Sequence, residues 1–490
     1  MAKNRSAGST GRGHDFVVVA NRLPVDATVD QDGTVQWTRS PGGLVTALAP
    51  LMRSGDGAWV GWPGRTEEDL DPFEADGIHL RPVPLTQQEV TDYYEGFSNA
   101  TLWPLYHDVI VPPEYHRHWW NTYRKVNERF ATEAADAADE GAEVWVQDYQ
   151  LQLVPAMLRR MRPDLRIGFF NHIPFPPVEL FGQLPWRSAV IEGLLGADLV
   201  GFQRSGDAAN FLRAVRRFTT HSTRGNEIAI DPGTQADDAD DAHNTGRRQV
   251  RAAAFPISID AAHFDEVARS EPVLERAAQI RRELGDPRTV LLGVDRLDYT
   301  KGIRHRFKAF GELLDEGKIT APGTALVQVA SPSRERVEQY QALRHQIEES
   351  VGHINGQHGS LAGAAIYYMH HSYPMEEMAA LYLAADVMLV TSLRDGMNLV
   401  AKEYAAARHD LGGVLVLSEF AGAAADLPQA LLINPHDIEG TKAAIMRAID
   451  MPERDRRRRM RALRRRVMDN DVRQWAQAFL STLQALTQER

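Results

Sequence analysis

The stretch DVMLVTSLRDGMNLVAKEYAAA (386–407) joins a short apolar run to a segment that is expected to be helical. The run is continuously apolar rather than alternating, which is typical of a strand covered on both faces, as in a parallel sheet. We expect Gly396 to let the chain turn sharply at the end of this strand and the helix to start near Met397. The stretch therefore predicts a strand–turn–helix unit with ionisable groups at the end of the strand.

The same unit recurs along the chain. Apolar runs that each lead into a polar residue, with helical segments between them, occupy residues 16–22, 143–148, 166–172, 197–204, 289–296, 324–334, 364–371, 386–395 and 412–419. Strands and helices in alternation predict an α/β fold with doubly wound sheets. Because the runs form two series, we expect two Rossmann-like lobes that face one another across a central cleft.

The composition along the chain indicates where the domains begin and end. Residues 1–14 are basic and rich in Gly and Ser, which predicts a disordered tail. We expect a first lobe at 15–254, with the polar and acidic segment 221–249 as a surface insertion. A second lobe is expected at 255–470, and a last helix at 471–490 could pack on either lobe, including back on the first.

The overall composition excludes several classes of protein. A length of 490 residues suggests two or three domains, and a net charge of −11 argues against a nucleic-acid partner. The absence of Cys excludes disulfides, thiolate metal sites and a Cys nucleophile, and it fits a reducing cytosol. No apolar stretch approaches the roughly 18 residues of a membrane span, so we expect a cytoplasmic protein with no membrane partner.

The familiar cofactor motifs are also missing. There is no G-x-G-x-x-G after a strand and no G-x-x-x-x-G-K-[ST] loop. The acidic run DDADD (237–241) is better explained as a solvated loop than as a metal site, and no carboxylate spacing supports a metal at His370–His371. We therefore expect no metal and no cofactor.

Polar residues follow the predicted strands in both series. In open α/β sheets, ligands bind beyond the carboxyl ends of the strands, and two lobes would bring these ends together across the cleft. Each of these residues by itself could be a loop residue in water, but that explanation is weaker for all seven. They are Asn21, Arg22, Asp148, His172, Arg296, Arg334 and Asp395.

Two segments have features suited to phosphate groups. Gly42 and Gly43 precede a helix, where backbone N–H groups can face an anion, although such a pair is usually only a tight turn. Arg296 follows a strand and Lys301 precedes a helix five positions later, which would suit a diphosphate. The alternative is a surface Arg and a helix-capping Lys.

The opening stretch could hold the rest of a nucleotide sugar. The N–H groups of Met397, Asn398 and Leu399 could face a phosphate, and Glu403, one turn later, could accept the hydroxyls of a ribose. Asp395 could hold hydroxyls of a sugar. The alternative is a capped amphipathic helix with solvated charges, although unpaired carboxylates would be costly beside the Ala-rich packed segment.

A set of motifs in this chain closely resembles the trehalose-6-phosphate synthases, which are retaining glycosyltransferases of the two-lobed GT-B fold. The motifs run over most of the chain and are highly specific in combination. They are NRLP (21–24), GGL (42–44), GWPG (61–64), YYEGFSNATLWP (93–104), QDYQL (147–151), FFNHIPFP (169–176), DRLDYTKGI (295–303), RDGMNLVAKEY (394–404) and VLVLSEFAGAA (414–424).

The resemblance implies transfer of glucose from a nucleotide-glucose to glucose 6-phosphate, which gives α,α-trehalose 6-phosphate and a nucleoside diphosphate. The implied acceptor-binding residues are Arg22, Trp62, Tyr94, Trp103, Asp148 and Arg334. The implied donor-binding residues are Gly42, Gly43, His172, Arg296, Lys301, Asp395, Gly396, Met397, Asn398, Leu399, Val400 and Glu403. Of these sets, we expect Arg296, Lys301, Asp395, His172 and Asp148 to take part in catalysis.

Several points stay open at the level of sequence. Because no feature identifies a carboxylate nucleophile, our hypothesis for a retaining reaction is front-face substitution. UDP-, ADP- and GDP-glucose share the ribose that Glu403 would bind, so the donor base is open, as is a dimer or tetramer. The alternatives are a non-catalytic sugar-phosphate sensor, an epimerase or phosphorylase on the same fold, and a glycosidase that uses Asp395 and Glu403.

Overall fold

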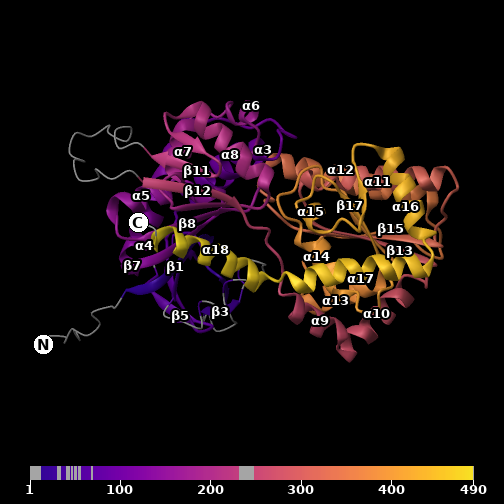
Figure 1. Ribbon diagram of the computed structural model, residues 1–490. Helices are drawn as coiled ribbons and strands as arrows, with labels where there is room; N and C mark the ends of the chain where they lie inside the picture. Colours follow the sequence, from indigo (N-terminus) through magenta and orange to yellow (C-terminus); the bar gives the residue numbers. More distant parts are fainter. Residues whose placement is uncertain are drawn as a thin grey trace, which may run out of the picture.

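The computed structural model describes residues 13–29, 35–39, 45, 48, 52, 57–67, 70–230 and 248–488. Figure 1 shows two lobes side by side, the first in indigo to magenta and the second mainly in orange and yellow. Each lobe is built on its own sheet, and a separate antiparallel hairpin of β2 (Val25–Val29) and β3 (Val35–Arg39) belongs to the first lobe. The predicted α/β fold with two Rossmann-like lobes is confirmed.

The first sheet has ten strands in the order β10-β11-β12-β9-β8-β7-β1-β4-β6-β5. Its central strands are parallel, whereas the pairs β5–β6, β10–β11 and β11–β12 are antiparallel. The strands are β1 (His14–Arg22), β4 (Gly57–Trp62), β5 (Phe73–Ala75), β6 (Ile78–Pro82), β7 (Ala138–Gln147), β8 (Arg166–Asn171), β9 (Leu199–Phe202), β10 (Ser222–Arg224), β11 (Glu227–Ile230) and β12 (Arg248–Ala254).

The expected surface insertion at 221–249 differs from the structure at both ends. Residues 222–224 and 227–230 form β10 and β11, and β12 begins at Arg248, so these parts extend the sheet at its edge. Strands at or beside an edge need only one buried face, as the alternating burial of β11 shows, and their polar composition resembles that of a loop. Residues 231–247 and residues 1–12 of the tail predicted at 1–14 lie outside the described residues, whereas His14 already belongs to β1, so the tail was predicted too long at that end.

Helices cover the first sheet because its strands are apolar on both faces. Val17, Val19, Val144 and Val146 pack with α4 in one core, whereas the neighbouring Val18 and Trp145 belong to another. The helical elements are α2 (Gln87–Glu89), η1 (Val90–Leu102), α3 (Trp103–Tyr106), α4 (Arg117–Ala137), η2 (Tyr149–Leu151), α5 (Val154–Met161), α6 (Val178–Phe181), α7 (Arg187–Leu194) and α8 (Ser205–Phe218).

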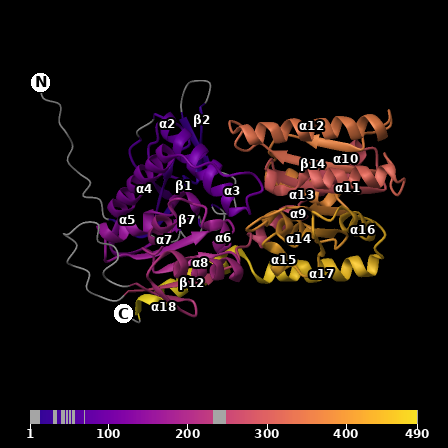
Figure 2. The same ribbon diagram turned by 90° about the horizontal axis from the view of Figure 1, so that it is seen from above.

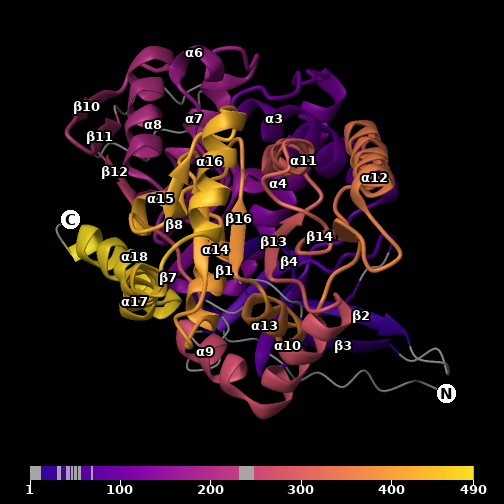
Figure 3. The same ribbon diagram turned by 90° about the vertical axis from the view of Figure 1, so that its right-hand side faces the viewer.

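The second sheet is parallel throughout, in the order β15-β14-β13-β16-β17-β18. Figure 3 shows α9, α10 and α13 on one side of it and α11 and α12 on the other. Its elements are α9 (Ala261–Arg269), α10 (Glu271–Glu283), β13 (Thr289–Arg296), η3 (Tyr299–Lys301), α11 (Ile303–Asp315), β14 (Thr324–Ser331), α12 (Glu338–His358), β15 (Ile366–Met369), α13 (Met375–Ala384), β16 (Val387–Val390), α14 (Leu399–Ala407), β17 (Val414–Ser418), α15 (Ala423–Asp426), β18 (Leu431–Ile433) and α16 (Ile438–Ile449).

The last two helices connect the lobes. Helix α17 (Glu453–Asp469) lies on the second lobe, and α18 (Val472–Gln488) returns to the first, as Figures 1 and 2 show. Phe479 of α18 packs where Gly168 and Gly201 leave the sheet bare, since a Cβ on either glycine would come within 2.7 Å of its ring. Helix α18 thus covers a face of the first sheet that would otherwise be exposed.

The chain passes from the first lobe to the second between β12 and α9. Phe255 and Ile257 pack with the first lobe and α18, whereas Ile259 and Ala261 belong to the core of the second lobe. The buried Lys402 donates to the carbonyl oxygen of Ile257 at 2.7 Å, which ties this connection to α14. Among the described helices, none has the length and apolarity to cross a bilayer.

Candidate functional site

The carboxyl ends of the two sheets meet at a cleft between the lobes. Arg22 ends β1, and Asp148 and His172 directly follow β7 and β8. Arg296 ends β13, and Arg334 and Asp395 lie beyond the ends of β14 and β16. A cavity of about 500 Å³ has residues of both lobes in its lining, including Arg22, Tyr94, Asp148, His172, Met397 and Leu399. Among the described strand-end residues, only those of the first lobe line this cavity, but Arg296 and Arg334 of the second lobe lie close enough to act on the charge of Asp148.

His172 lies at the floor of the cleft in the first lobe. Its side chain is buried, and Nε2 lies 2.9 Å from Oε1 of Gln147. Burial lowers the pKa of His172 to about 3, so the imidazole is neutral at physiological pH. A neutral ring whose Nε2–H donates to Gln147 keeps Nδ1 free of a proton.

Gly396 is the point at which the second lobe touches the main chain of His172. A Cβ on Gly396 would come within 2.4 Å of the His172 carbonyl oxygen. The chain bends at Gly396 as expected, but the positive φ of 67° belongs to Asn398, so the turn itself does not require a glycine at 396. Glycine is required here by the close approach of two backbones.

Asp148 occupies a strained position beside His172. It adopts a φ of 70°, which is unusual for a residue with a side chain, and its Oδ1 accepts from the His172 N–H at 3.0 Å. Burial raises the pKa of Asp148 to about 6, even though hydrogen bonds from the backbone N–H groups of Tyr149 and His172 lower it. The carboxyl group therefore changes charge close to physiological pH.

Lys301 and Asp395 form a buried ion pair in the second lobe. Nζ of Lys301 lies 2.6 Å from Oδ2 of Asp395, which also accepts from Nδ2 of Asn398 at 3.1 Å. Burial would raise the pKa of Asp395, but Lys301 and the hydrogen bonds hold it below its usual range. Lys301 is therefore not merely a helix-capping lysine, and Asp395 is not a solvated charge, because the two side chains are largely buried and paired with each other.

Trp103 lies against two guanidinium groups at the cleft. The guanidinium carbon of Arg334 is 3.8 Å from the centroid of the Trp103 ring, and that of Arg296 is 5.4 Å from it. Arg296 is exposed, and no hydrogen bond or ion pair holds its side chain in the part of the chain that the structure describes. An exposed guanidinium of this kind is available to an anionic ligand.

Arg22, Trp62 and Tyr94 lie together in the first lobe. Arg22 pairs with Asp26 at 2.8 Å and lies 5.1 Å from the Trp62 ring, whose centroid is 6.3 Å from that of Tyr94. They line a second cavity of about 490 Å³, and Arg336 of the other lobe closes its edge. This cavity shares Arg22 and Tyr94 with the first one, so the two are neighbours.

Helix α14 begins later than expected. Asn398 caps it by accepting from the Ala401 N–H at 3.1 Å, and the Met397 N–H donates to Oδ1 of Asp395 at 3.2 Å. Glu403 accepts from the Tyr382 hydroxyl at 2.8 Å, and burial raises the pKa of Glu403. Leu399 and Val400 are half-buried at the start of the helix, whereas Gly42 and Gly43 lie outside the described residues.

Several residues that support the site were not predicted from the sequence. Gln147 contacts His172, and Asp298 and the Tyr340 hydroxyl both accept from Nη1 of Arg334. A usable signal existed for the first two, since Gln147 directly precedes Asp148 and Asp298 lies between Arg296 and Lys301. No pattern pointed to Tyr340, which lies within a long helix.

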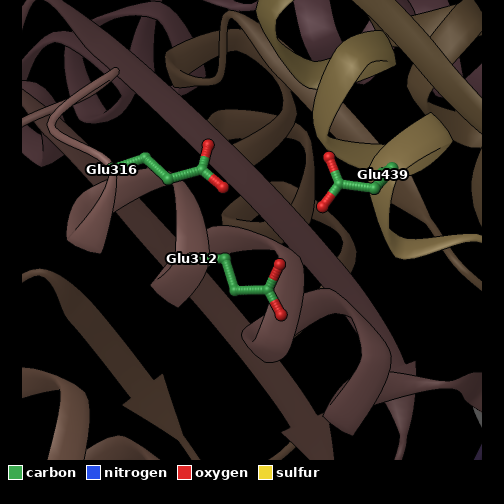
Figure 4. Close-up of side chains that lie close together, drawn as sticks. All are labelled: Glu312, Glu316 and Glu439. Carbon is green, nitrogen blue, oxygen red and sulfur yellow. The ribbon is translucent and has the colours of Figure 1, made fainter.

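One carboxylate cluster outside the cleft could suggest a metal centre. Figure 4 shows the carboxylates of Glu312, Glu316 and Glu439, whose nearest oxygens lie within 4.8 Å of one another. Nζ of the buried Lys442 contacts all three at 2.5–3.0 Å. This ammonium group already supplies the positive charge that a cation would bring, so the cluster joins α11 to α16 rather than forming an open site.

The whole arrangement matches one family. The sequence profile of glycosyltransferase family 20 matches residues 14–485, which include both lobes and every described residue of the cleft. The chain belongs to glycosyltransferase family 20. Among family 20 relatives, the trehalose-6-phosphate synthase of Mycolicibacterium vanbaalenii is 58% identical over 489 residues, 99% of this chain and 98% of the relative. That of Mycobacterium avium is 59% identical over 473 residues, 96% of this chain and 95% of the relative.

Solved structures of similar proteins agree with the family 20 assignment. A trehalose-6-phosphate protein from E. coli bound with UDP-2-fluoro glucose superposes with a TM-score of 0.85 at 33% identity, over 96% of this chain and 98% of that one. An α,α-trehalose-phosphate synthase (UDP-forming) from Burkholderia xenovorans in complex with glucose 6-phosphate has the same TM-score and identity, over 96% and 99%.

Proposed function

We propose that this family 20 chain transfers glucose from a nucleotide-glucose to glucose 6-phosphate and forms α,α-trehalose 6-phosphate with retention of configuration. The observation that carries the proposal is the cluster of cationic side chains from both lobes around one cleft, with Arg296 and Arg334 against Trp103. This transfer needs groups that bind the monophosphate of the acceptor and the diphosphate of the donor side by side. The similar proteins bound to a UDP-glucose analogue and to glucose 6-phosphate support the same pair of ligands.

The acceptor end of the proposed site is formed by both lobes. Arg22, Tyr94 and Arg334 would bind the phosphate, and Trp103 would lie beside it. Because Arg22 and Arg334 come from different lobes, a bound phosphate would draw the lobes together. Trp62 and Asp148 would contact the sugar, with Asp148 accepting from a hydroxyl when it is ionised.

The donor end lies in the second lobe and at His172. Arg296 and Lys301 would bind the diphosphate, the former as a fork and the latter as a point charge. Asp395, whose carboxylate is oriented by Lys301 and Asn398, would hold hydroxyls of the glucose together with His172. Glu403, whose Oε2 is fixed by Tyr382, would accept the hydroxyls of the ribose, and residues 396–400 would lie along the diphosphate.

We propose front-face substitution as the chemical step. The bond between the anomeric carbon and the diphosphate oxygen breaks, and the 1-hydroxyl of glucose 6-phosphate bonds to the same face of that carbon. The hydroxyl proton passes to the departing diphosphate oxygen. Arg296 and Lys301 would stabilise the charge that develops on the leaving group, which is the usual role of such preorganised groups. The step needs no metal in this proposal.

The test is an assay of glucose 6-phosphate with UDP-, ADP- and GDP-glucose in turn, with and without EDTA. We expect trehalose 6-phosphate, a 1,1-linkage with both anomeric centres α by NMR, and the same rate with EDTA. Release of free glucose without the acceptor would indicate a glycosidase instead. Binding of both ligands without turnover would indicate a sensor, and a changed hexose on the nucleotide would indicate an epimerase.

The state of the protein in the cell is a separate proposal. We propose a cytoplasmic homo-oligomer, a dimer or tetramer, on the strength of the family resemblance. Light scattering of the purified chain tests it, since a mass near 54.7 kDa would mean a monomer.

A further inference from the structure

Asp298 is a completely buried carboxylate between two residues of the proposed donor site. It follows β13, two residues after Arg296 and three before Lys301, and its exposed fraction is 0%. It lines neither of the two cavities at the cleft. A buried carboxylate needs hydrogen-bond donors or cations around it, and these partners show which residues Asp298 positions.

One carboxylate oxygen of Asp298 fixes the turn that carries Lys301. Oδ1 accepts from the Thr300 N–H at 2.9 Å and so caps the short helix η3, while the Lys301 N–H donates to the main-chain oxygen of Asp298 at 3.1 Å. Lys301 ends this helix, and its Nζ reaches Asp395 at 2.6 Å. The cap therefore sets the direction from which Lys301 meets the donor site.

The other oxygen holds the arginine of the proposed acceptor site. Oδ2 accepts from Arg334 Nη1 at 3.1 Å and from the Tyr340 hydroxyl at 3.0 Å. The Arg334 side chain is 4% exposed, and its guanidinium carbon lies over the Trp103 ring, 3.8 Å from the centroid. Because a buried guanidinium needs a counter-charge and a fixed plane to present its remaining N–H groups, Asp298 sets both for Arg334.

The ionised form of Asp298 is favoured by this environment. Burial alone would raise the pKa of Asp298, but the charges of Arg334, Arg296 and Lys301 together hold it below its usual range. Those three cations are the residues that the proposed function assigns to the two phosphate groups. One carboxylate thus lies among the cations of both substrates.

We propose that Asp298 is a positioning residue that couples the acceptor and donor sites, orienting Arg334 through Oδ2 and Lys301 through Oδ1. The inference rests on the proposed function and adds to it a residue that touches neither substrate. Loss of the first contact should weaken binding of glucose 6-phosphate, and loss of the second should impair the donor side.

Two substitutions separate the two oxygens. In Asp298→Asn the amide oxygen can still accept from Thr300, but the amide N–H₂ then faces the donors on Arg334 and Tyr340. We expect the KM for glucose 6-phosphate to rise about tenfold or more, as for a lost hydrogen bond to a charged group, while the KM for the nucleotide-glucose stays within about threefold. Asp298→Ala removes both contacts, so both KM values should rise.

A matched control is available in the first lobe. Asp198, which directly precedes β9, is also almost completely buried. Its Oδ2 accepts from Nη2 of Arg159 at 2.7 Å and from the Ile167 N–H at 2.9 Å. Asp198→Asn should lower the melting temperature and leave the ratio of the two KM values unchanged. A purely structural role for Asp298 predicts that behaviour for Asp298→Asn as well, and that result would overturn the proposal.

The proposal stays testable if Asp298→Asn does not fold. Tyr340→Phe removes only the hydroxyl shared by Asp298 and Arg334, and it should raise the KM for glucose 6-phosphate about two- to fivefold with no change for the donor. An unchanged acceptor KM there would count against the proposal. A wild-type chain that forms no trehalose 6-phosphate would instead refute the proposed function, and the assignment of Asp298 with it.

Discussion

Gly396 and His172 come from different lobes and meet backbone to backbone. The space for a Cβ at Gly396 is filled by the His172 carbonyl oxygen, 2.4 Å away. This contact places the loop that carries Asp395 directly against the floor of the first lobe. It also fixes the distance between the strand ends of the two sheets, so the shape of the cleft depends on a residue without a side chain.

The first prediction concerns this contact. Gly396→Ala should push the Asp395 loop away from His172, because the atoms that it meets are backbone and cannot rotate aside. We expect a loss of at least about tenfold in kcat/KM, since misplacement by about 1 Å can cost as much as 10²-fold. Steady-state kinetics measure it. The control is Gly352→Ala in α12, where a Cβ meets nothing within 4 Å and activity should be retained.

The second prediction concerns Arg296. Because its guanidinium is exposed, Arg296→Ala should leave the melting temperature nearly unchanged. It should lower kcat by about 10²-fold or more, as for a lost electrostatic donor at the leaving group. Arg282→Ala, which removes an exposed arginine at the end of α10, should leave kcat unchanged. Near-normal turnover of the Arg296 variant would exclude the proposed role.

The third prediction concerns pH. Burial raises the pKa of Asp148 to about 6, so the ionised carboxylate needed to accept from the acceptor sugar is lost as the pH falls through 6. The kcat/KM for glucose 6-phosphate should therefore decline below about pH 6. Asp148→Asn should have low activity without this decline, apart from the part due to protonation of the substrate phosphate, which also titrates near 6.

A second carboxyl group titrates in the same range and serves as the comparison. Burial raises the pKa of Asp207 to about 6, and this residue lies 3.7 Å from Arg394 across the lobes. Asp207→Asn should keep the acid limb that we assign to Asp148. If the limb disappears in this variant and persists in Asp148→Asn, the assignment is wrong.

The fourth prediction concerns the carboxylate cluster around Lys442. Lys442→Met leaves Glu312, Glu316 and Glu439 without their common counter-charge, so the melting temperature should fall by several degrees. Calcium should then raise the melting temperature of the variant and not that of the wild type, because oxygen ligands of this kind bind hard cations once the ammonium is gone. Lys308→Ala is the control, because Lys308 is exposed and its Nζ is as far as 4.0 Å from Oε1 of Glu312, so its removal should change the melting temperature little.

The fifth prediction concerns the returning helix. Phe479 stacks on Trp145 at 4.4 Å and fills the space above Gly168 and Gly201. Phe479→Ala should lower the free energy of unfolding by about 3–5 kcal/mol, the usual cost of such a cavity. Denaturant unfolding measures it. A smaller loss, below about 1 kcal/mol, would show that α18 does not depend on this contact.

Much of the fold followed from local patterns. The runs at 289–296 and 386–395 contain β13 and β16, and the run at 16–22 covers all but the first two residues of β1, because the buried centre of such a strand is apolar on both faces. The strands that were overlooked, such as β5, β6 and β11, lie at or beside the edges of the first sheet and are half-exposed. Their alternating or polar sequences resemble loops, so composition alone could not separate the two.

The sequence by itself determined the two α/β lobes, the polar residues at the strand ends and the family resemblance, since periodicity and motifs are local properties of the chain. Only the tertiary structure decided that α18 returns to the first lobe, that Lys301 pairs with Asp395, and that Trp103 faces two arginines. These contacts join residues that lie far apart in sequence: the Lys301–Asp395 pair depends on packing within the second lobe, and the contacts of Trp103 depend on how the two lobes pack. Packing between lobes is decided by shape and burial, which no local pattern encodes.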